Sequence, residues 1–224
     1  MTKPRIQAAG IGREGQPLVT IDDFSADPDS FRAAAMSAPF EPASHHYPGI
    51  RAPLPADYLE KQLPLITSLI RRIFGRHGEM RVIDASFSMV TTPPGALSRR
   101  QRLPHCDAFD PERIAFIHYL MPQASEGTAF FRHRATGYET VDQARRPSFF
   151  ARLEAELASG DEPQGYIAGD TGLFERISVA EARYNRALLY PSFLLHSGAI
   201  APDAILSTDP AAGRLTVTGF LSVG

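Results

Sequence analysis

The chain has 224 residues, 43% of them hydrophobic, and its 23 Lys and Arg against 25 Asp and Glu leave a formal net charge of -2. This length fits one domain, residues 1–224, and this composition excludes wholesale disorder. The near-neutral charge offers no general attraction to a phosphate backbone, so nucleic acid is an unfavourable partner. The only cysteine, Cys106, cannot form an intramolecular disulfide, and no stretch approaches the roughly 20 apolar residues of a membrane span. We therefore expect a cytoplasmic protein without membrane attachment.

The N-terminal part of the chain, residues 1–80, predicts a mainly helical support region. LVTIDDF at 18–24 predicts a short strand, and the segment after it predicts a helix that Asp27 caps. A second helix is predicted over 57–75, because its apolar residues recur at steps of three and four. Pro64 inside this helix predicts a kink or a break into two helices.

From residue 81 the pattern changes to runs of β-branched and aromatic residues. These runs predict strands at 81–91, 113–120, 127–133, 186–198 and 214–223. Helices are predicted between them, at 147–160 and 178–185. The expected fold is therefore α+β, with helices supporting a sheet or barrel formed by residues 81–224.

The most informative short motif is His105-Cys106-Asp107. On an extended strand, residues two apart face the same side, so His105 and Asp107 can ligate one ion while Cys106 faces away. A lone His-x-Asp is common by chance and needs a third ligand. His196 is the best candidate, since it ends the apolar run ALLYPSFLLHSG, although a buried histidine satisfied by an ordinary hydrogen bond would give the same pattern.

A polar strand face follows at the C-terminal end. Arg214, Thr216 and Thr218 alternate with apolar residues there. Two histidines and one carboxylate suit non-haem Fe(II) and leave coordination positions open for a chelating cosubstrate and dioxygen. An arginine nearby offers a fork for the far carboxylate of that cosubstrate, and a threonine hydroxyl adds a donor.

In this order the motifs HCD, RIAFIHYL followed by EGTAFF, YPSFLLHSG and GRLTVTGFL resemble the Fe(II)/2-oxoglutarate-dependent dioxygenase superfamily, and most closely a bacterial family in its prolyl-hydroxylase-like branch. The resemblance covers about residues 81–224. It implies a double-stranded β-helix (jelly-roll) core, iron held by the catalytic residues His105, Asp107 and His196, and 2-oxoglutarate held by Arg214 and Thr216.

The same resemblance implies O2 as co-reactant and hydroxylation of a C–H bond in a small-molecule or peptide substrate. The presence of Asp107 favours hydroxylation over halogenation, since related halogenating enzymes lack this carboxylate. The sequence departs from the pattern of this branch at two places. APDAILSTDPAA at 201–212 predicts an inserted loop before Arg214, and SFSMV at 86–90 lacks the cosubstrate-binding residues that the branch often places there.

Several further polar side chains have both a structural and a functional explanation: His45, His46, His118, Tyr119, His133, Arg99, Arg100 and Arg102. The paired histidines in the Pro-rich loop are expected to be solvated, with substrate contact as the alternative. The three arginines predict a solvated cluster or an attraction for an anion. His118 and Tyr119 are neighbours on one predicted strand, so only one can face the interior. We expect His133 at the surface of a hairpin.

Two other functions remain open. A cupin-like isomerase or hydrolase would use the same three ligands and a metal-bound water, without a need for Arg214. A non-catalytic binding protein would keep the fold and use these residues as ordinary buried polar groups. The substrate, the oxidised position and a homodimer are also left open, and specificity is expected in the loops at 40–55, 134–185 and 199–213.

Overall fold

A computed structural model describes residues 3–44, 47–123, 125–160 and 162–224. The helices are α1 (Pro28–Met36), α2 (Ala56–Ile73) and α3 (Arg146–Ala158), with short 3-10 helices at Pro94–Ala96 and Arg99–Arg102. The strands are β1 (Arg5–Ile11), β2 (Gln16–Asp22), β3 (Glu41–Pro42), β4 (Gly49–Pro53), β5 (Met80–Val90), β6 (Arg113–Tyr119), β7 (Ser125–His133), β8 (Phe174–Ala182), β9 (Arg186–Pro191), β10 (His196–Ala199) and β11 (Leu215–Val223).

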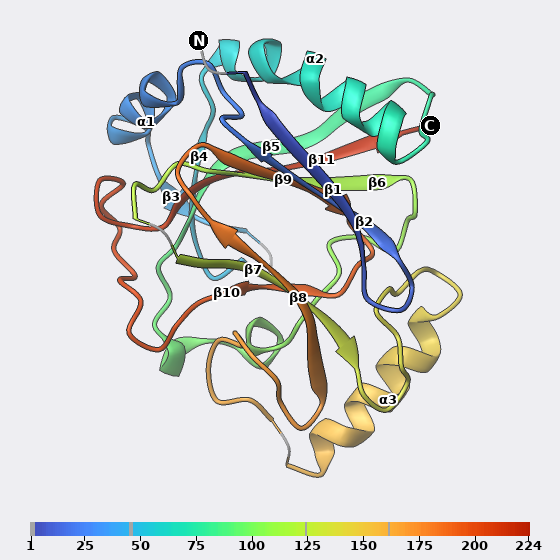
Figure 1. Cartoon of the computed structure of the whole chain (residues 1–224). Helices are drawn as coiled ribbons and strands as arrows, with labels where there is room; N and C mark the ends of the chain where they lie inside the picture. Colours follow the sequence, from blue (N-terminus) through green and yellow to red (C-terminus); the bar gives the residue numbers. More distant parts are fainter. Residues whose placement is uncertain (1–2, 45–46, 124, 161) are drawn as a thin grey trace.

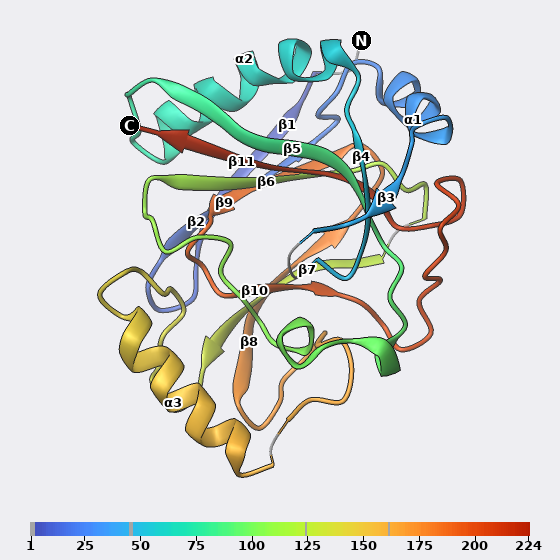
Figure 2. The same cartoon turned by 180° about the vertical axis from the view of Figure 1, so that it is seen from behind.

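The strands form two antiparallel sheets that face each other, a jelly-roll-like arrangement. The large sheet has the order β1-β2-β9-β6-β11-β5-β4-β3, and the small sheet has the order β10-β7-β8. Helices α1 and α2 cover the outer face of the large sheet, whereas α3 lies beside the small sheet (Figure 1). The same layers are seen from behind in Figure 2.

Strand β11 shows how the sequence sorts its side chains between the two faces. Leu215, Val217 and Leu221 belong to the apolar core between the large sheet and α1 and α2. Thr216 and Thr218 alternate with them and therefore face the space between the sheets. The outer face of the large sheet thus builds the main core, and its inner face is free to carry polar groups.

The predicted N-terminal helices are confirmed, and the structure defines their ends. The side chain of Asp27 caps α1 by accepting a hydrogen bond from Ser30 N at 3.2 Å. Helix α2 continues through Pro64 as one helix. Pro64 and Glu60, four residues before it, are both exposed, so water can satisfy the carbonyl that the proline leaves without a partner. Besides the expected strand at 18–24, this region contributes β1, β3 and β4.

Two predictions from the second half are wrong. The predicted helix at 178–185 is mostly strand β8, in which Ala180 and Ala182 face inward and Glu181 faces solvent. Tertiary pairing with β7 overrides the helix propensity of this segment. The run at 186–198 is not one strand: β9 lies in the large sheet, β10 lies in the small sheet, and a turn joins them.

Among the described residues, no helix combines the length and the apolar character that crossing a bilayer requires.

Candidate metal centre

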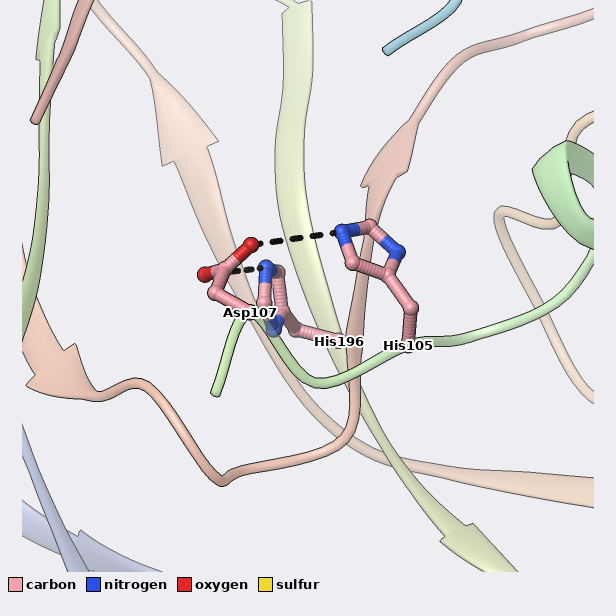
Figure 3. Close-up of side chains that lie close together, drawn as sticks. All are labelled: His105, Asp107 and His196. Atoms are coloured by element: carbon pink, nitrogen blue, oxygen red, sulfur yellow. Dashed lines mark ion pairs between the residues drawn. The ribbon is translucent and has the colours of Figure 1, made fainter. Parts of the chain in front are cut away.

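His105, Asp107 and His196 converge on one point between the two sheets. Each offers a ligand atom, and these atoms all lie within 4.8 Å of one another. His196 begins β10, whereas His105 and Asp107 lie in an irregular segment after the second 3-10 helix. Figure 3 shows the carboxylate of Asp107 facing both imidazoles. This group could hold a metal ion.

The backbone brings these distant stretches of chain together. His105 lies outside the named strands and forms an isolated antiparallel bridge with His196. The nitrogen of Asp107 donates to the carbonyl of Ser192 at 2.9 Å. Cys106 faces away as predicted, with its thiol donating to the carbonyl of Phe193 at 3.0 Å. The turn between β9 and β10 is therefore the support on which the His-x-Asp segment lies.

The hydrogen bonds of His196 leave one of its ring nitrogens free to bind a metal ion. Nδ1 lies 2.9 Å from the carbonyl of Leu194, which can only accept, so Nδ1 carries the proton. Nε2 then has a free lone pair and lies 3.3 Å from Asp107 Oδ2. His105 Nε2 lies 3.6 Å from Asp107 Oδ1. A backbone carbonyl that orients a metal-ligating imidazole in this way is a usual support of metal sites.

Burial and charge give two of these groups the protonation state that a cation requires. Burial lowers the pKa of His196, which favours the neutral imidazole. Burial alone would raise the pKa of Asp107, but His196, His105 and Arg51 together bring it below its ordinary value. The side chains of His196 and Asp107 are only 6% and 15% exposed, whereas that of His105 is 55% exposed. The site is thus closed around His196 and open beside His105.

Arg214 lies just before β11 and reaches into the same interior. Its Nη2 donates to the carbonyl of Gly127 on β7 at 2.5 Å, and its Nε is buried without a hydrogen-bond partner among the described residues. A Cβ at Gly198 would lie 3.9 Å from Arg214 Nη1. Gly198 and His196 share one face of β10, roughly 6.6 Å apart along the strand. The guanidinium therefore lies beside the residue that follows His196 on the same face of β10.

Thr216 lies on the same face but uses its hydroxyl hydrogen elsewhere. Its Oγ1 donates to the carbonyl of Ser88 at 3.0 Å, and the residue is buried. The oxygen lone pairs remain available, so Thr216 can accept a hydrogen bond in this arrangement. The expected donation to a cosubstrate carboxylate would require the hydroxyl to rotate away from Ser88.

Three other polar side chains of the interior were missed by the sequence analysis: Arg51, Tyr47 and Tyr166. Burial raises the pKa of Tyr47, and the charges of Arg214 and Arg51 oppose that rise. Tyr166 donates to the carbonyl of Thr92 at 2.7 Å. The two tyrosines lie in loops, where no periodic pattern could have identified them. Arg51 precedes the buried Ala52 on a short strand, and this alternation of polar and apolar residues could have identified it.

His118 and Tyr119 face opposite sides of β6, as predicted. Tyr119 faces the interior, where its hydroxyl lies 2.7 Å from Thr128 Oγ1 and its ring centre 5.8 Å from the Arg214 guanidinium. His118 faces the helices and contacts Tyr58 at 2.9 Å. His118 is therefore a structural residue.

Three of the remaining candidates, His133, Arg99 and Arg102, pair with carboxylates other than that of Asp107. His133 is buried beside α3, with Nε2 2.9 Å from Glu156, so the expectation of a surface position is wrong. Arg99 and Arg102 lie 3.3 and 3.7 Å from the carboxylate of Glu162. Arg100 is exposed on the same turn. His45 and His46 lie outside the described residues.

The 201–212 segment is irregular and joins β10 to β11, as expected for an inserted loop.

A comparison with known proteins finds a similar fold in one solved structure. HygX from Streptomyces hygroscopicus, with nickel, 2-oxoglutarate and hygromycin B bound, is similar in structure at a TM-score of 0.53 and 12% identity, over 92% of this chain and 82% of that one. The same protein with nickel and 2-oxoglutarate gives a TM-score of 0.46 at the same identity and coverage. No curated protein matches the sequence. Residues 2–221 match the model of a family of unknown function, DUF6445, and the chain therefore belongs to that family.

Proposed function

We propose that this protein is an Fe(II)- and 2-oxoglutarate-dependent oxygenase that hydroxylates a C–H bond of a small-molecule or peptide substrate. The observation that carries the proposal is the convergence of His105, Asp107 and His196, with their ligand atoms within 4.8 Å of one another between the two sheets. Two imidazoles and one carboxylate are the donor set that suits non-haem Fe(II) and leaves positions open.

Arg214 distinguishes this function from other uses of the same ligands. A buried guanidinium nitrogen such as Nε of Arg214 is costly unless something accepts its hydrogen bond. A 2-oxo dicarboxylate that chelates a metal at its oxo-acid end would carry its second carboxylate toward this group. The fold similarity to HygX supports the proposal, because that protein binds nickel and 2-oxoglutarate on a similar fold.

The roles of the residues follow from their positions. His105, Asp107 and His196 would hold the metal, and Arg214, with Thr216 beside it, would hold the cosubstrate. Bound Fe(II), with 2-oxoglutarate and O2, supplies the oxidant for the C–H bond. The rings of Tyr190 and Phe130 lie 4.9 and 6.4 Å from that of His196 and exclude water from this side. Substrate would approach from the open side beside His105.

The decisive experiment is an anaerobic titration of the purified chain with Fe(II), followed by 2-oxoglutarate. We expect one Fe(II) per chain and a rise in thermal stability when 2-oxoglutarate is added, since ligand at about 100 times its Kd adds about 2.7 kcal/mol. On admission of O2, succinate should form. An Asp107→Ala variant that produces succinate at the wild-type rate would contradict the proposal.

The same measurements separate the two rival functions. Turnover without 2-oxoglutarate and without O2 would favour the cupin-like isomerase or hydrolase, in which Arg214 has no required partner. A chain that takes up no Fe(II) and gains no stability from Fe(II) with 2-oxoglutarate would favour the non-catalytic binding protein.

The organisation of the chain belongs to the same proposal. We infer that the two facing sheets form the double-stranded β-helix of the prolyl-hydroxylase-like branch and that residues 1–224 act as a single domain. The lone cysteine, with its thiol turned onto Phe193, suits a reducing compartment such as the cytoplasm.

A further inference from the structure

Arg51 faces the same interior as the candidate metal ligands. It lies on β4 opposite Ser88 of β5, whose side chain contacts Thr218 on the inner face of the large sheet. Its neighbour Ala52 packs into the core under the helices, on the other face. Because successive side chains of a strand point to opposite faces, Arg51 points between the sheets.

The guanidinium of Arg51 is held in place but retains donor capacity. It lies over the ring of Tyr47, 4.7 Å from the ring centre. Its Nη1 lies 3.3 Å from Asp84 Oδ2, and Asp84 is half exposed. Its Nε is buried and has no hydrogen-bond partner among the described residues. One long, partly solvated ion pair therefore leaves most of the five N–H donors of this arginine for a ligand.

Arg51 and Arg214 occupy different parts of this interior. Arg51 contacts the ring of Tyr47, whereas Arg214 contacts the carbonyl of Gly127 on β7 and the ring of Tyr119. The guanidinium of Arg51 points between the sheets, on the side where its charge also acts on the carboxylate of Asp107. A cosubstrate bound by Arg214 would leave Arg51 facing the remaining space on that side.

We propose that Arg51 is a substrate-binding residue and that it selects a substrate carrying a carboxylate. This inference rests on the proposed oxygenase function and names the substrate class for it. The planar guanidinium matches a carboxylate through two parallel hydrogen bonds. Asp84 already balances part of its charge, which suits a monoanion and disfavours a phosphate dianion.

The test is a calorimetric titration of the full chain under anaerobic conditions, with Fe(II) and saturating 2-oxoglutarate present. The probes are acetate, benzoate and N-acetylglycine, each compared with its uncharged amide. We expect at least one acid to bind more tightly than its amide. Arg51→Gln should weaken that binding about tenfold or more, and Arg51→Lys should weaken it less, because it keeps the charge but loses the fork.

Two further variants complete the design. Asp84→Asn removes the competing carboxylate and should tighten binding of the acid by up to about fivefold. Arg81→Gln changes an arginine that is 74% exposed on β5 and should leave the affinity unchanged. The inference is overturned if no acid binds better than its amide, if Arg51→Gln binds the acid as tightly as the wild type, or if its main effect is on 2-oxoglutarate affinity. If the wild type binds neither Fe(II) nor 2-oxoglutarate, the proposed function itself is wrong.

Discussion

His105 and His196 hold each other in place through two backbone hydrogen bonds, from His105 N to His196 O at 2.9 Å and from His196 N to His105 O at 3.0 Å. This pair connects an irregular segment to the first residue of β10. It places the two side chains next to each other, and their ring centres lie 4.5 Å apart. The candidate metal centre is therefore set by backbone pairing before any ion binds, and this pre-organisation reduces the ordering that a metal would otherwise have to impose.

Removal of a proposed metal ligand should abolish metal binding without unfolding the chain. Asp107→Ala and His105→Ala should each weaken Fe(II) binding by more than the roughly 10- to 100-fold typical of lost supporting groups. Anaerobic metal titration measures this effect, and circular dichroism checks the fold. Asp203→Asn, a change on an exposed loop, is the control. Wild-type Fe(II) affinity in Asp107→Ala would refute the assignment of the ligands.

Arg214 should affect the cosubstrate and not the metal. Arg214→Gln should weaken 2-oxoglutarate binding by about 10- to 100-fold, because a charge-assisted hydrogen-bonded pair is worth roughly 1.5–3 kcal/mol. Fe(II) affinity should stay close to that of the wild type, since a protonated guanidinium offers no lone pair to a metal. Titration with each ligand separately gives the comparison. Equal losses of Fe(II) and 2-oxoglutarate affinity would indicate structural damage instead of a cosubstrate role.

Glu139 should be a major source of stability away from the site. Its carboxylate accepts hydrogen bonds from the backbone of Arg13 and Glu14 and from the side chain of Arg132, and it is fully buried. A Cβ on Gly12 would lie 2.1 Å from Glu139 Oε2, and Gly12 has a φ of +66°, so glycine permits this approach of the β1–β2 turn. The carboxylate thus attaches this turn to the loop after β7.

Glu139→Ala should therefore lower the free energy of unfolding by about 3–5 kcal/mol, as expected when one partner of a buried ion pair is lost. Urea denaturation measures the change. Glu175 provides a matched control, because it pairs with the same Arg132 at 2.7 Å but is 40% exposed, so Glu175→Ala should cost only about 0–1 kcal/mol. Equal losses in the two variants would contradict this account.

His118 should make stability depend on pH. Its Nε2 lies 3.1 Å from Asn185 Oδ1, an acceptor, so Nε2 carries the proton and Nδ1 accepts from Tyr58. Burial lowers the pKa of His118 to about 4, against 6.5 for an ordinary histidine. Between these values the unfolded chain binds more protons than the folded chain. The contribution of His118 is thus complete above pH 6.5 and is lost as the pH falls toward 4.

His118→Gln should remove this dependence. The wild type should lose on the order of 3 kcal/mol more than the variant between pH 7.5 and pH 4, since one pKa unit corresponds to about 1.36 kcal/mol. Denaturation of both proteins across this range gives the difference, in which the shared effects of other groups cancel. Parallel stability curves for the two proteins would show that His118 is not buried in its neutral form.

The types of the candidate metal ligands and the local helices and strands could be predicted from the sequence. A capping aspartate before Pro28 places a helix, and the alternation of Thr216 and Thr218 with apolar residues places a polar strand face; both are short-range effects of backbone geometry. The segment at 178–185 shows where this reasoning fails. Its Glu and Ala residues favour a helix in isolation, but pairing with β7 is a long-range interaction that local propensity does not contain.

The sequence by itself determined which residues have the chemistry for a metal and an anion: two histidines, one aspartate and one arginine. Only the tertiary structure decided that the run at 186–198 divides between two sheets, which brings His196 to His105, and that Arg51 and Tyr47 face the same interior. The physical reason is that local sequence sets which side chains share a face of a strand. Pairing between distant segments decides which sheet that strand joins and what its faces enclose.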